Sequence, residues 1–579
     1  MAKNRGVENL ANSPRKNIDY IAYLMLIPSI APILYINISN AFITFYGGFY
    51  ILTSIVLVLL FIFKNKTIIS GQDQLFFSKQ ALSLFFLVTF ISLTYSIVFK
   101  YLAFRMDNTD AGIFISMIRD VFYGKFGYAT GVGFYHLERH QNYILFLLAT
   151  VYFIFFKSII PVLILNATAI LGAGFILYKI TRLYFNQLIA LVVAFTFYAS
   201  PIHSSFTWFY PEVYYVLAIT LMFYVCITKQ KALYIILAAC FLLSIKEEAP
   251  LYMLGFLFIM WQHKRFRLMS VLVLLTVSVA LINIVVVEPY FQHKNILLGT
   301  NPPNIISTYF TKWGISYGEI IKNIITNPID FISFCFDASS GFWPNYMYWF
   351  FLPLLSPFVL LSSIPVIFLS GASDNTFDLH QMINYHSLGV GVIAYIGIII
   401  VFKQFVEKIP KYKQVLQTIL LFIMLSHNML FVNYSALFSN QSSDSSIPSM
   451  DLFMRMPLNF LWWRAYYKVN FDDVLDNNKN GEYIEKHYHN ASIRVASNIY
   501  NNMLNFDLPN LQRNITFDAN NNHLYQENCN CILVFTYDPS GLLQSQLSPE
   551  DISGLNKLFQ SNKCDKFGKF YSCDNRIIN

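Results

Sequence analysis

Runs of about 20 consecutive apolar residues recur along this chain, and each is long enough to cross the hydrocarbon core of a bilayer as a helix. Only 12% of the 579 residues are charged, about half of the charged fraction of a soluble domain. The sequence therefore predicts an all-α polytopic membrane protein. The candidate spans lie near residues 19–39, 43–63, 80–103, 158–180, 186–200, 211–227, 231–245, 249–262, 268–288, 387–404 and 414–433.

Two apolar segments do not fit a simple span. Segment 143–156 is too short to cross comfortably, so we expect an interfacial or re-entrant helix there. Segment 345–371 contains three prolines, which interrupt helical hydrogen bonding. We expect this segment to be a helical hairpin, or two broken helices, that returns to the face from which it started. With it, the chain has about 13 membrane helices.

The positions of the basic residues predict the orientation. Lys and Arg gather in the N-terminal segment and in every second loop, and such loops remain on the cytoplasmic side. The net charge of +8 therefore indicates membrane topology rather than binding to nucleic acid. We expect a protein of the cytoplasmic (inner) membrane with its N-terminus inside. The parts expected outside are loops 105–142 and 289–344 and the segment 434–579.

The domain organisation follows from a change in composition near residue 434. Residues 1–433 form the predicted membrane domain, and residues 434–579 have the length and the short β-like pieces of a small extracytoplasmic α/β module. The latter contains Cys529, Cys531, Cys564 and Cys573. An exported segment favours one or two disulfides, with Cys529 and Cys531 each pairing to Cys564 or Cys573. A metal site is the weaker alternative, because the usual two-residue spacing is absent.

Loop 105–142 is an island of charge in an apolar chain. Asp110 precedes an apolar run, with Asp107 three residues before it. A carboxylate just outside a span can act as a general base or bind a divalent cation. The alternative, which the motif alone favours, is that Asp110 caps a helix and stabilises it by about 1 kcal/mol.

Charged residues also stand at the ends of short spans. Lys246, Glu247 and Glu248 separate two of them, where charge is costly unless it is paired or functional. Glu212 follows a proline and opens a span, a position typical of a helix cap. His140 lies where the charged loop re-enters the membrane. The sequence HLERH lacks the order of a zinc helix, and no phosphate-binding loop or nucleophile elbow is present.

Several short motifs, in order, resemble one family. DAGIF at 110–114, VFYGKFGYAT at 121–130, KEEA at 246–249 and NYHS at 384–387 are similar to motifs of the predicted membrane proteins catalogued as domain of unknown function 2079. That family is usually placed with the GT-C-type glycosyltransferases. Where the family tends to have Phe-His-Pro-Glu, this chain has Tyr210 in place of the histidine.

The resemblance implies a GT-C-like membrane glycosyltransferase. It would move a sugar from a polyprenyl-phosphate donor in the membrane lipid to a glycan, lipid or protein acceptor at the outer face. Asp110 would be the base, or would hold Mg²⁺ or Mn²⁺ together with Glu247, and His140 would complete the catalytic group. The substrate-binding candidates are Asp107, Arg105, Arg119, Lys246, Glu248, Glu212 and His386, of which Lys246, Arg105 and Arg119 would hold the donor phosphate.

Two other functions stay open at this point. A transporter or flippase for a lipid-linked glycan is favoured by the broken segment 345–371, since discontinuous helices often mark transport sites. An assembly subunit without a site of its own is the third. Convergence of Asp110, His140, Glu247 and His386 at the outer membrane boundary would favour the enzyme.

Overall fold

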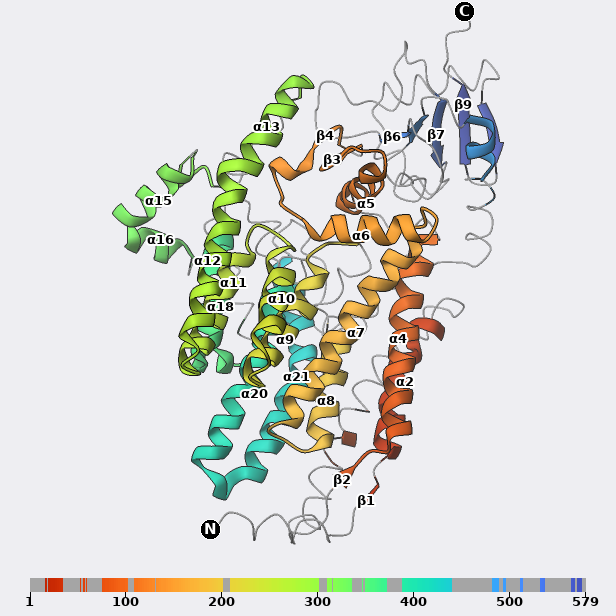
Figure 1. The fold of residues 1–579 in the computed structure, drawn as a ribbon. Coiled ribbons are helices and arrows are strands. Elements are labelled where there is room, and N and C mark those ends of the chain that lie inside the picture. The colour runs from red at the N-terminus through yellow and green to blue at the C-terminus, as the bar shows by residue number, and fades with distance from the viewer. Residues whose placement is uncertain are drawn as a thin grey trace, which may run out of the picture.

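In the computed structural model, long helices stand side by side as a bundle, and a small sheet lies beyond one end (Figure 1). The parts of the chain that the structure describes are residues 16–17, 19–34, 53, 56–57, 59, 75–102, 109–130, 132–200, 209–300, 310–314, 316–335, 346, 349–371, 388–439, 479, 482–488, 493–495, 511–513, 532–536, 564–567 and 570–574.

The helices of the bundle follow the predicted spans closely. They are α2 (Asp19–Leu34), α4 (Lys79–Leu102), α7 (Ile160–Arg182), α8 (Gln187–Tyr198), α9 (Val213–Ile227), α10 (Ala232–Leu243), α11 (Ala249–Gln262), α12 (Phe266–Ile282), α18 (Pro357–Gly371), α20 (Leu388–Lys408) and α21 (Lys413–Ser439). Of the predicted span 43–63, the described residues 53, 56, 57 and 59 are helical.

The remaining elements lie mostly at the ends of the bundle. They are α5 (Thr109–Phe122), α6 (Ile144–Ile154), α13 (Glu288–Leu297), α15 (Tyr317–Thr326), α16 (Pro328–Cys335), the π-helical turn η4 (Asn283–Val287), the 3₁₀ turns η2 (His136–Glu138), η5 (Leu352–Leu355) and η7 (Pro410–Tyr412), and the strands β1 (Lys16–Asn17), β2 (Leu75–Phe76), β3 (Tyr128–Ala129) and β4 (Phe134–Tyr135).

The protein is a polytopic helical membrane protein, as predicted. Within the described residues, four helices are long and apolar enough to cross a membrane by themselves: 79–99, 160–182, 266–297 and 388–408. Shorter apolar helices, such as α9 and α11, complete the bundle. The mid-section of the surface carries large exposed apolar side chains such as Leu274 and Val277 of α12. In lipid this exposure carries no cost, because the surroundings are as apolar as the side chains.

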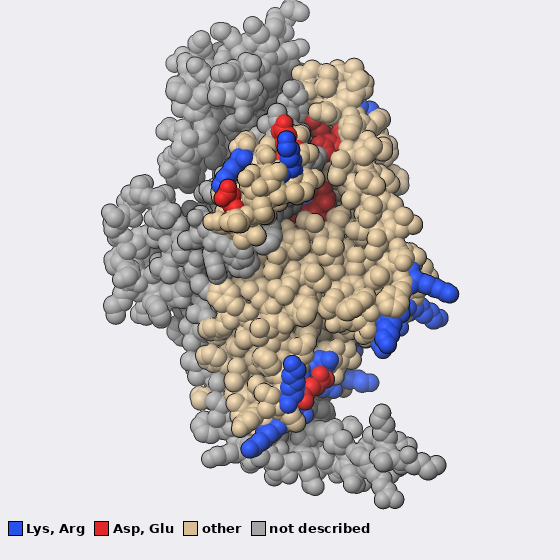
Figure 2. All heavy atoms as spheres, turned by 90° about the vertical axis from the view of Figure 1, so that its left-hand side faces the viewer, with Lys and Arg blue, Asp and Glu red and all other residues tan. Residues whose placement is uncertain are grey.

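Basic side chains gather at one end of the bundle. The turns between α9 and α10, α11 and α12, and α20 and α21 all carry Lys or Arg, and the last turn of α7 carries Lys179 and Arg182. Figure 2 shows these charges along the lower part of the molecule, beneath a broad band without charged side chains. We call this the basic end, and the opposite end the loop end. The connections 123–143 and 244–248 lie at the loop end.

The short helix α6 lies across the loop end of the bundle rather than along it (Figure 1). The sequence predicted an interfacial or re-entrant helix here, and the crosswise position corresponds to the interfacial form. Its exposed apolar side chains include Leu147 (58% exposed) and Phe153 (61%). An apolar helix that lies flat at the end of a membrane bundle fits the boundary between acyl chains and headgroups.

Most of the charged segment 105–142 has regular secondary structure. Its apolar residues 111–118 are buried in α5, which packs on α6. In the last turn of α5, Asp120 accepts hydrogen bonds from the Thr130 amide (2.7 Å) and hydroxyl (2.6 Å). Strands β3 and β4 then pair antiparallel, with Tyr128 opposite Tyr135. The segment is thus a helix and a hairpin held against the end of the bundle.

The proline-rich segment reverses direction, as predicted. The 3₁₀ turn η5 precedes α18, and Phe350 and Phe351 before it have positive φ angles of 52° and 58°. The hydroxyls of Tyr346, before the turn, and Ser363, in α18, form a hydrogen bond. Tyr346 therefore lies beside α18, which continues through Pro365 as one helix.

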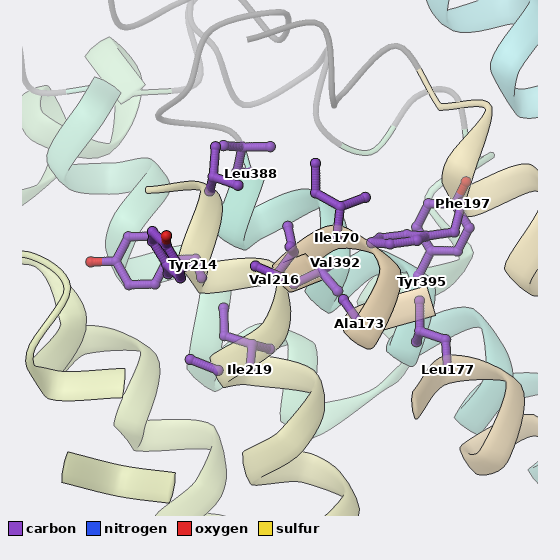
Figure 3. Packing of buried hydrophobic residues seen from close by; sticks show 14 of the residues in the cluster. Ile170, Ala173, Leu177, Phe197, Tyr214, Val216, Ile219, Leu388, Val392 and Tyr395 are labelled. Carbon is purple, nitrogen blue, oxygen red and sulfur yellow. The ribbon is translucent and has the colours of Figure 1, made fainter. Parts of the chain in front are cut away.

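The core of the bundle is a continuous apolar cluster. Figure 3 shows side chains of α7, α8, α9 and α20 that point toward one another, among them Ile170, Phe197, Val216 and Tyr395. Most residues of α8, α9 and α20 are buried, because neighbouring helices rather than lipid surround them. Half of α7 is buried.

Close packing of α11 on α18 requires a glycine. A Cβ atom added to Gly255 would lie 1.7 Å from Ser362 Oγ and 2.8 Å from the Phe358 carbonyl oxygen. Because a backbone atom cannot rotate away, we expect Gly255→Ala to lower the free energy of unfolding by about 1–3 kcal/mol. Chemical unfolding in detergent micelles measures this change.

The control for that substitution is Gly318→Ala. Gly318 lies in α15 with no heavy atom within 4 Å of the added Cβ, so alanine should leave stability unchanged or raise it by up to about 1 kcal/mol. Equal stability of Gly255→Ala and the wild type would contradict the tight contact between α11 and α18.

The C-terminal segment forms a mixed sheet of five strands. They are β5 (Ile493–Val495), β6 (Leu511–Arg513), β7 (Ile532–Thr536), β8 (Cys564–Phe567) and β9 (Phe570–Asp574), in the order β6-β5-β7-β9-β8. β5 pairs parallel with β6 and β7, whereas β9 pairs antiparallel with β7 and β8. The domain boundary at residue 434 stays a prediction, and α21 continues to Ser439.

One disulfide corrects the sequence prediction. Cys564 of β8 bonds to Cys573 of β9, rather than either residue pairing with Cys529 or Cys531. The two cysteines stand opposite each other on adjacent antiparallel strands, with Cα atoms 4.0 Å apart. The hairpin brings them together, a pairing that linear spacing did not suggest. Cys529 and Cys531 lie outside the described residues.

Candidate active site at the loop end

A buried ion pair lies where α10 turns into α11. The Lys246 Nζ atom lies 2.7 Å from Glu212 Oε1 and 3.9 Å from Glu248 Oε2, and the Lys246 and Glu212 side chains are only 3% and 1% exposed. Glu212 precedes α9, 34 positions earlier in the chain. Breaking such a buried pair is costly, because it leaves a charge without compensation.

Glu247 points from the same turn toward the polar loop. Its Oε1 atom lies 2.9 Å from His140 Nδ1, and its Oε2 atom accepts the Gln141 amide at 3.2 Å. The His140 and Glu247 side chains are 27% and 31% exposed. This pair is therefore open to an incoming molecule, whereas the Lys246–Glu212 pair beneath it is closed.

Two hydrogen bonds to backbone carbonyls hold the loop to the turn beside that contact. The Asn142 side-chain amide donates to the Ile245 carbonyl oxygen at 2.9 Å, and the Ile144 backbone amide donates to the Ser244 carbonyl oxygen at 2.8 Å. Such bonds between buried groups fix the position of His140 against Glu247. The geometry is that of a supported site rather than of a mobile contact.

The two outer carboxyls of the turn differ in acidity. Burial would raise the pKa of Glu247, but the charge of His140, its hydrogen bond and the charge of Lys246 outweigh burial and lower that pKa to about 2. Burial raises the pKa of Glu248 to about 7, despite the opposing charge of Lys246. Carboxyls whose environments separate their pKa values are a common feature of acid–base sites.

The raised pKa of Glu248 predicts a pH-dependent effect of Glu248→Gln. The folded pKa of about 7 lies above the ordinary value of 4.5, so ionisation of this carboxyl costs stability as pH rises from 4.5 to 7. Below pH 4.5 the cost is absent. The stability of Glu248→Gln relative to the wild type should therefore rise by about 3 kcal/mol between pH 4.5 and pH 8.

Unfolding at several pH values measures that difference. Glu407→Gln is the control, since Glu407 is 62% exposed beside Lys403 on α20 and an exposed pair contributes little at any pH. A constant difference between Glu248→Gln and the wild type across this range would contradict the raised pKa.

Several predicted site residues lie away from the Lys246–Glu248 turn or outside the described residues. Asp110 is the second residue of α5, and its side chain lies outside the described residues. Arg105, Asp107 and His386 also lie outside them. Arg119 is buried on α5, with Nε 3.8 Å from the carboxylate of Asp120. The structure thus brings together four predicted residues with His140: Glu212, Lys246, Glu247 and Glu248.

Two interpretations need revision. Glu212 makes no capping hydrogen bond at the start of α9; its carboxylate is directed to Lys246 instead. Lys246, assigned to the donor phosphate, lies between carboxylates and is 3% exposed. A buried amine pairs with the nearest carboxylate, because a buried charge without a partner is costly. Glu212 is far from Lys246 in sequence, so the sequence alone did not indicate this pairing.

The described residues around Glu247 do not fit a divalent cation. Among the residues that the structure describes, no group of three or more His, Cys, Asp or Glu side chains is arranged to hold a metal ion. Both oxygens of Glu247 already bond to His140 and Gln141, and Lys246 adds positive charge nearby. The described residues therefore do not assign a metal-binding role to Glu247.

Buried polar atoms without partners surround this turn. Glu212 Oε2, Glu248 Oε1 and the hydroxyls of Tyr215 and Tyr252 form no hydrogen bond within the described structure. The two tyrosine rings lie 5.0 Å apart, and the charges of both glutamates act on both hydroxyls. Donors and acceptors in such a group suit a ligand rich in hydroxyls.

Sequence reasoning missed the role of the second long loop. Residues 288–297 form α13, which continues α12 beyond the bundle. The Asn295 side chain bonds to the backbone amide and carbonyl of Tyr135, at 2.6 and 3.0 Å, and to the Glu138 carboxylate at 2.5 Å. Asn295 thereby ties α13 to the strand and turn that precede His140. An asparagine in a predicted loop gave no signal of this contact.

A second missed residue is His427 of α21. Its Nδ1 atom bonds the Met424 carbonyl oxygen and its Nε2 atom bonds the Tyr395 hydroxyl, both at 2.7 Å. Its ring stacks on Trp349. Both ring nitrogens have partners, so His427 is a structural histidine of the core.

Comparison with known proteins gives the family. The model of a family described as "Predicted membrane protein (DUF2079)" matches residues 103–460. This chain belongs to that family. The match includes α5, the HLERH turn, Glu212 and the KEE turn, and therefore the whole of the site described above. It does not include α2 or the strands β5–β9.

The family assignment agrees with the motifs read from the sequence. The one departure, Tyr210, is buried and packs its ring against Phe114 of α5, with centroids 6.0 Å apart. Tyr210 therefore joins the segment before α9 to α5 by an aromatic contact.

Other comparisons add little. ArnT from Cupriavidus metallidurans, in a crystal structure with bound undecaprenyl phosphate, is similar over 86% of this chain and 98% of its own, with 10% identity and a TM-score of 0.43. A likeness of this size assigns neither fold nor activity. No curated protein matches the sequence.

Proposed function

We propose that this DUF2079 protein is a membrane glycosyltransferase of GT-C type that takes a sugar from a polyprenyl-phosphate donor. The observation that supports it best is the pairing of Glu247 with His140 beside Lys246, Glu212 and Glu248 at the loop end. Charged residues at membrane depth are rare unless they serve a function. The sequence resemblance supplies the reaction, which the residues alone do not specify.

The proposed reaction needs a base and an exit for phosphate. Asp110 takes the proton of the acceptor hydroxyl, whose oxygen then bonds the anomeric carbon of the sugar. The bond between that carbon and the phosphate oxygen breaks, and its electron pair leaves with the polyprenyl phosphate. Inversion at the anomeric carbon follows from the family resemblance.

The described residues contribute positioning in this proposal. Glu247 holds the His140 ring, and His140 is one-quarter exposed, so its other nitrogen is able to bond a substrate oxygen. The hydroxyls of Tyr215 and Tyr252 are buried below and form no hydrogen bond within the described structure, and this proposal assigns them to the sugar as further donors and acceptors. Preorganised donors and acceptors of this kind favour one orientation of the substrate.

The orientation of the protein is part of the proposal. The basic end carries the Lys and Arg turns, and positive loops remain in the cytoplasm. We place the loop end at the outer face of the cytoplasmic membrane, with the N-terminus inside and the segment after 434 outside. The Cys564–Cys573 disulfide supports this placement, since disulfides persist in oxidising compartments.

One observation favours a flippase instead. The chain reverses at η5, between Tyr346 and α18, and discontinuous helices of this kind often line transport sites. A flippase moves the lipid-linked sugar between leaflets without breaking a covalent bond. A transferase releases polyprenyl phosphate.

Proteoliposomes distinguish the two functions. The purified protein is reconstituted with radiolabelled polyprenyl-phosphate hexoses and pentoses and with a membrane extract as acceptor. We expect one donor to release polyprenyl phosphate in step with label entering the acceptor. Movement of the intact donor between leaflets, without release of phosphate, would establish the flippase and refute the transferase.

A further inference from the structure

The helical turn from His136 to His140 presents three basic side chains on one face. The amides of Arg139 and His140 both donate to the His136 carbonyl oxygen, at 2.9 and 3.0 Å. Positions i, i+3 and i+4 of such a turn are neighbours, and the His136 and His140 rings lie 5.2 Å apart. We call these three residues the basic turn.

Two nitrogens of the basic turn lack partners. His136 Nδ1 and Arg139 Nε are buried, and neither forms a hydrogen bond within the described structure. The His136 side chain is held between the rings of Phe114 and Phe134, and the residue is only 5% exposed. Leaving a buried donor without an acceptor costs stability, and the cost is larger when the donor is charged. These two nitrogens therefore indicate an acceptor that binds here.

The nearby carboxylates do not supply that acceptor. Glu138 accepts the Asn295 amide group; the charge of Arg139 acts on its carboxyl, but Arg139 Nε makes no hydrogen bond to it. Glu247 is bonded to His140 and Gln141. Burial lowers the pKa of His136, and the charges that lower it further are all positive, from His140, Arg139 and Lys246. The electrostatic potential at this ring therefore favours an anion.

The place of the basic turn indicates the kind of anion. Four residues after His140 the chain enters α6, which lies across the loop end with exposed apolar side chains such as Leu147 and Phe153. Headgroup phosphates lie directly outside the acyl chains that such a helix contacts. A phosphate on a lipid would reach the basic turn while its tail lies against α6.

We propose that the basic turn binds the phosphate group of a polyprenyl-phosphate lipid, with Arg139 and His136 donating to its oxygens. This deepens the proposed function and rests on it for the identity of the lipid. It also moves the phosphate ligands away from Lys246 and Arg119, whose charges are opposed by buried carboxylates. Arginine suits the task because its planar donors match a phosphate.

The test is a direct binding measurement on the full-length protein in nanodiscs, with farnesyl monophosphate as the probe. Arg139→Gln should weaken its affinity roughly 10- to 100-fold, the effect of losing a charge-assisted hydrogen bond. His136→Phe, which keeps the ring between Phe114 and Phe134, should weaken it roughly tenfold.

Two further variants separate binding from folding. Arg139→Lys keeps the charge and should lose less affinity than Arg139→Gln. Arg267→Gln removes an exposed charge at the basic end and should bind the probe as the wild type does. Unchanged affinity in both Arg139→Gln and His136→Phe would overturn the proposal.

Two comparison ligands identify the source of the phosphate. Farnesol, which has the tail without the charge, should bind far more weakly than farnesyl monophosphate; equal binding would refute a phosphate site. Inorganic phosphate that binds as tightly as the probe would refute a lipid ligand. The assay involves no transfer, so binding without transfer refutes only the proposed function. Transfer with normal binding in both variants refutes only the basic turn.

Discussion

Replacing Lys246 with methionine is expected to lower the free energy of unfolding by about 3–5 kcal/mol. Methionine is of similar length and loses only the charged group. Glu212, which is 1% exposed and 2.7 Å from Lys246 Nζ, would be left buried without its counter-charge. Burial alone would lower the pKa of Lys246, but Glu212, Glu248 and Glu247 outweigh it and raise that pKa. Thermal and chemical unfolding in detergent both measure the loss.

Lys403→Met is the matched control for this prediction. Lys403 pairs with Glu407 one turn along α20, at 3.6 Å and with one-third of its side chain exposed. Such a pair contributes about 0.3–0.5 kcal/mol. The double variant Lys246→Met with Glu212→Gln should recover part of the lost stability, because the most deeply buried of the carboxylates facing Lys246 is then neutral as well. A single variant as stable as the wild type would show that the buried pair has no structural role.

Replacing Asp110 with asparagine is expected to reduce sugar transfer by about 10²–10⁴-fold. The substitution separates the two interpretations of this residue. Asparagine caps a helix about as well as aspartate, so a capping role predicts normal stability and normal transfer. A general base loses its function with its charge, so a catalytic role predicts normal stability and almost no transfer.

The transfer assay in proteoliposomes measures this effect, with Asp330→Asn as the control. Asp330 is exposed in the first turn of α16, so this variant makes the same chemical change away from the site and should keep full transfer. Full activity of Asp110→Asn, with normal expression and folding, would exclude Asp110 as the base.

Most of the helical architecture could be predicted, because the bilayer restricts it. Each span must satisfy its own backbone hydrogen bonds in lipid, so length and apolarity alone locate it. The bounds of α11, 249–262, were predicted to the residue, and α7, α8, α9 and α20 within a few residues. The crosswise α6 and the reversal near Pro353 followed from length and proline content. The second long loop, predicted over 289–344, was located less accurately, since the helix 266–297 continues through its first nine residues.

The site was predicted in its residue types rather than in its contacts. That Lys246, Glu247 and Glu248 need partners followed from the cost of charge near a membrane. That the main partner of Lys246 is Glu212, and that of Glu247 is His140, did not. These residues are 34 and 107 positions apart, and no local rule relates them.

The sequence by itself determined that this chain is a polytopic helical membrane protein of the DUF2079 family, with its unusual charges in a few connections. The cost of placing a charge or an unpaired backbone group in lipid is large and depends on the local sequence. The order of apolar and charged residues therefore predicts the spans and their connections. Only the tertiary structure decided how those charges divide. It placed Glu212 with Lys246 in a closed pair, left His140 and Glu247 open, and put the unpaired nitrogens of His136 and Arg139 on one turn. Those choices depend on the packing of α9, α10 and α11 against the loop, which distant parts of the chain determine together.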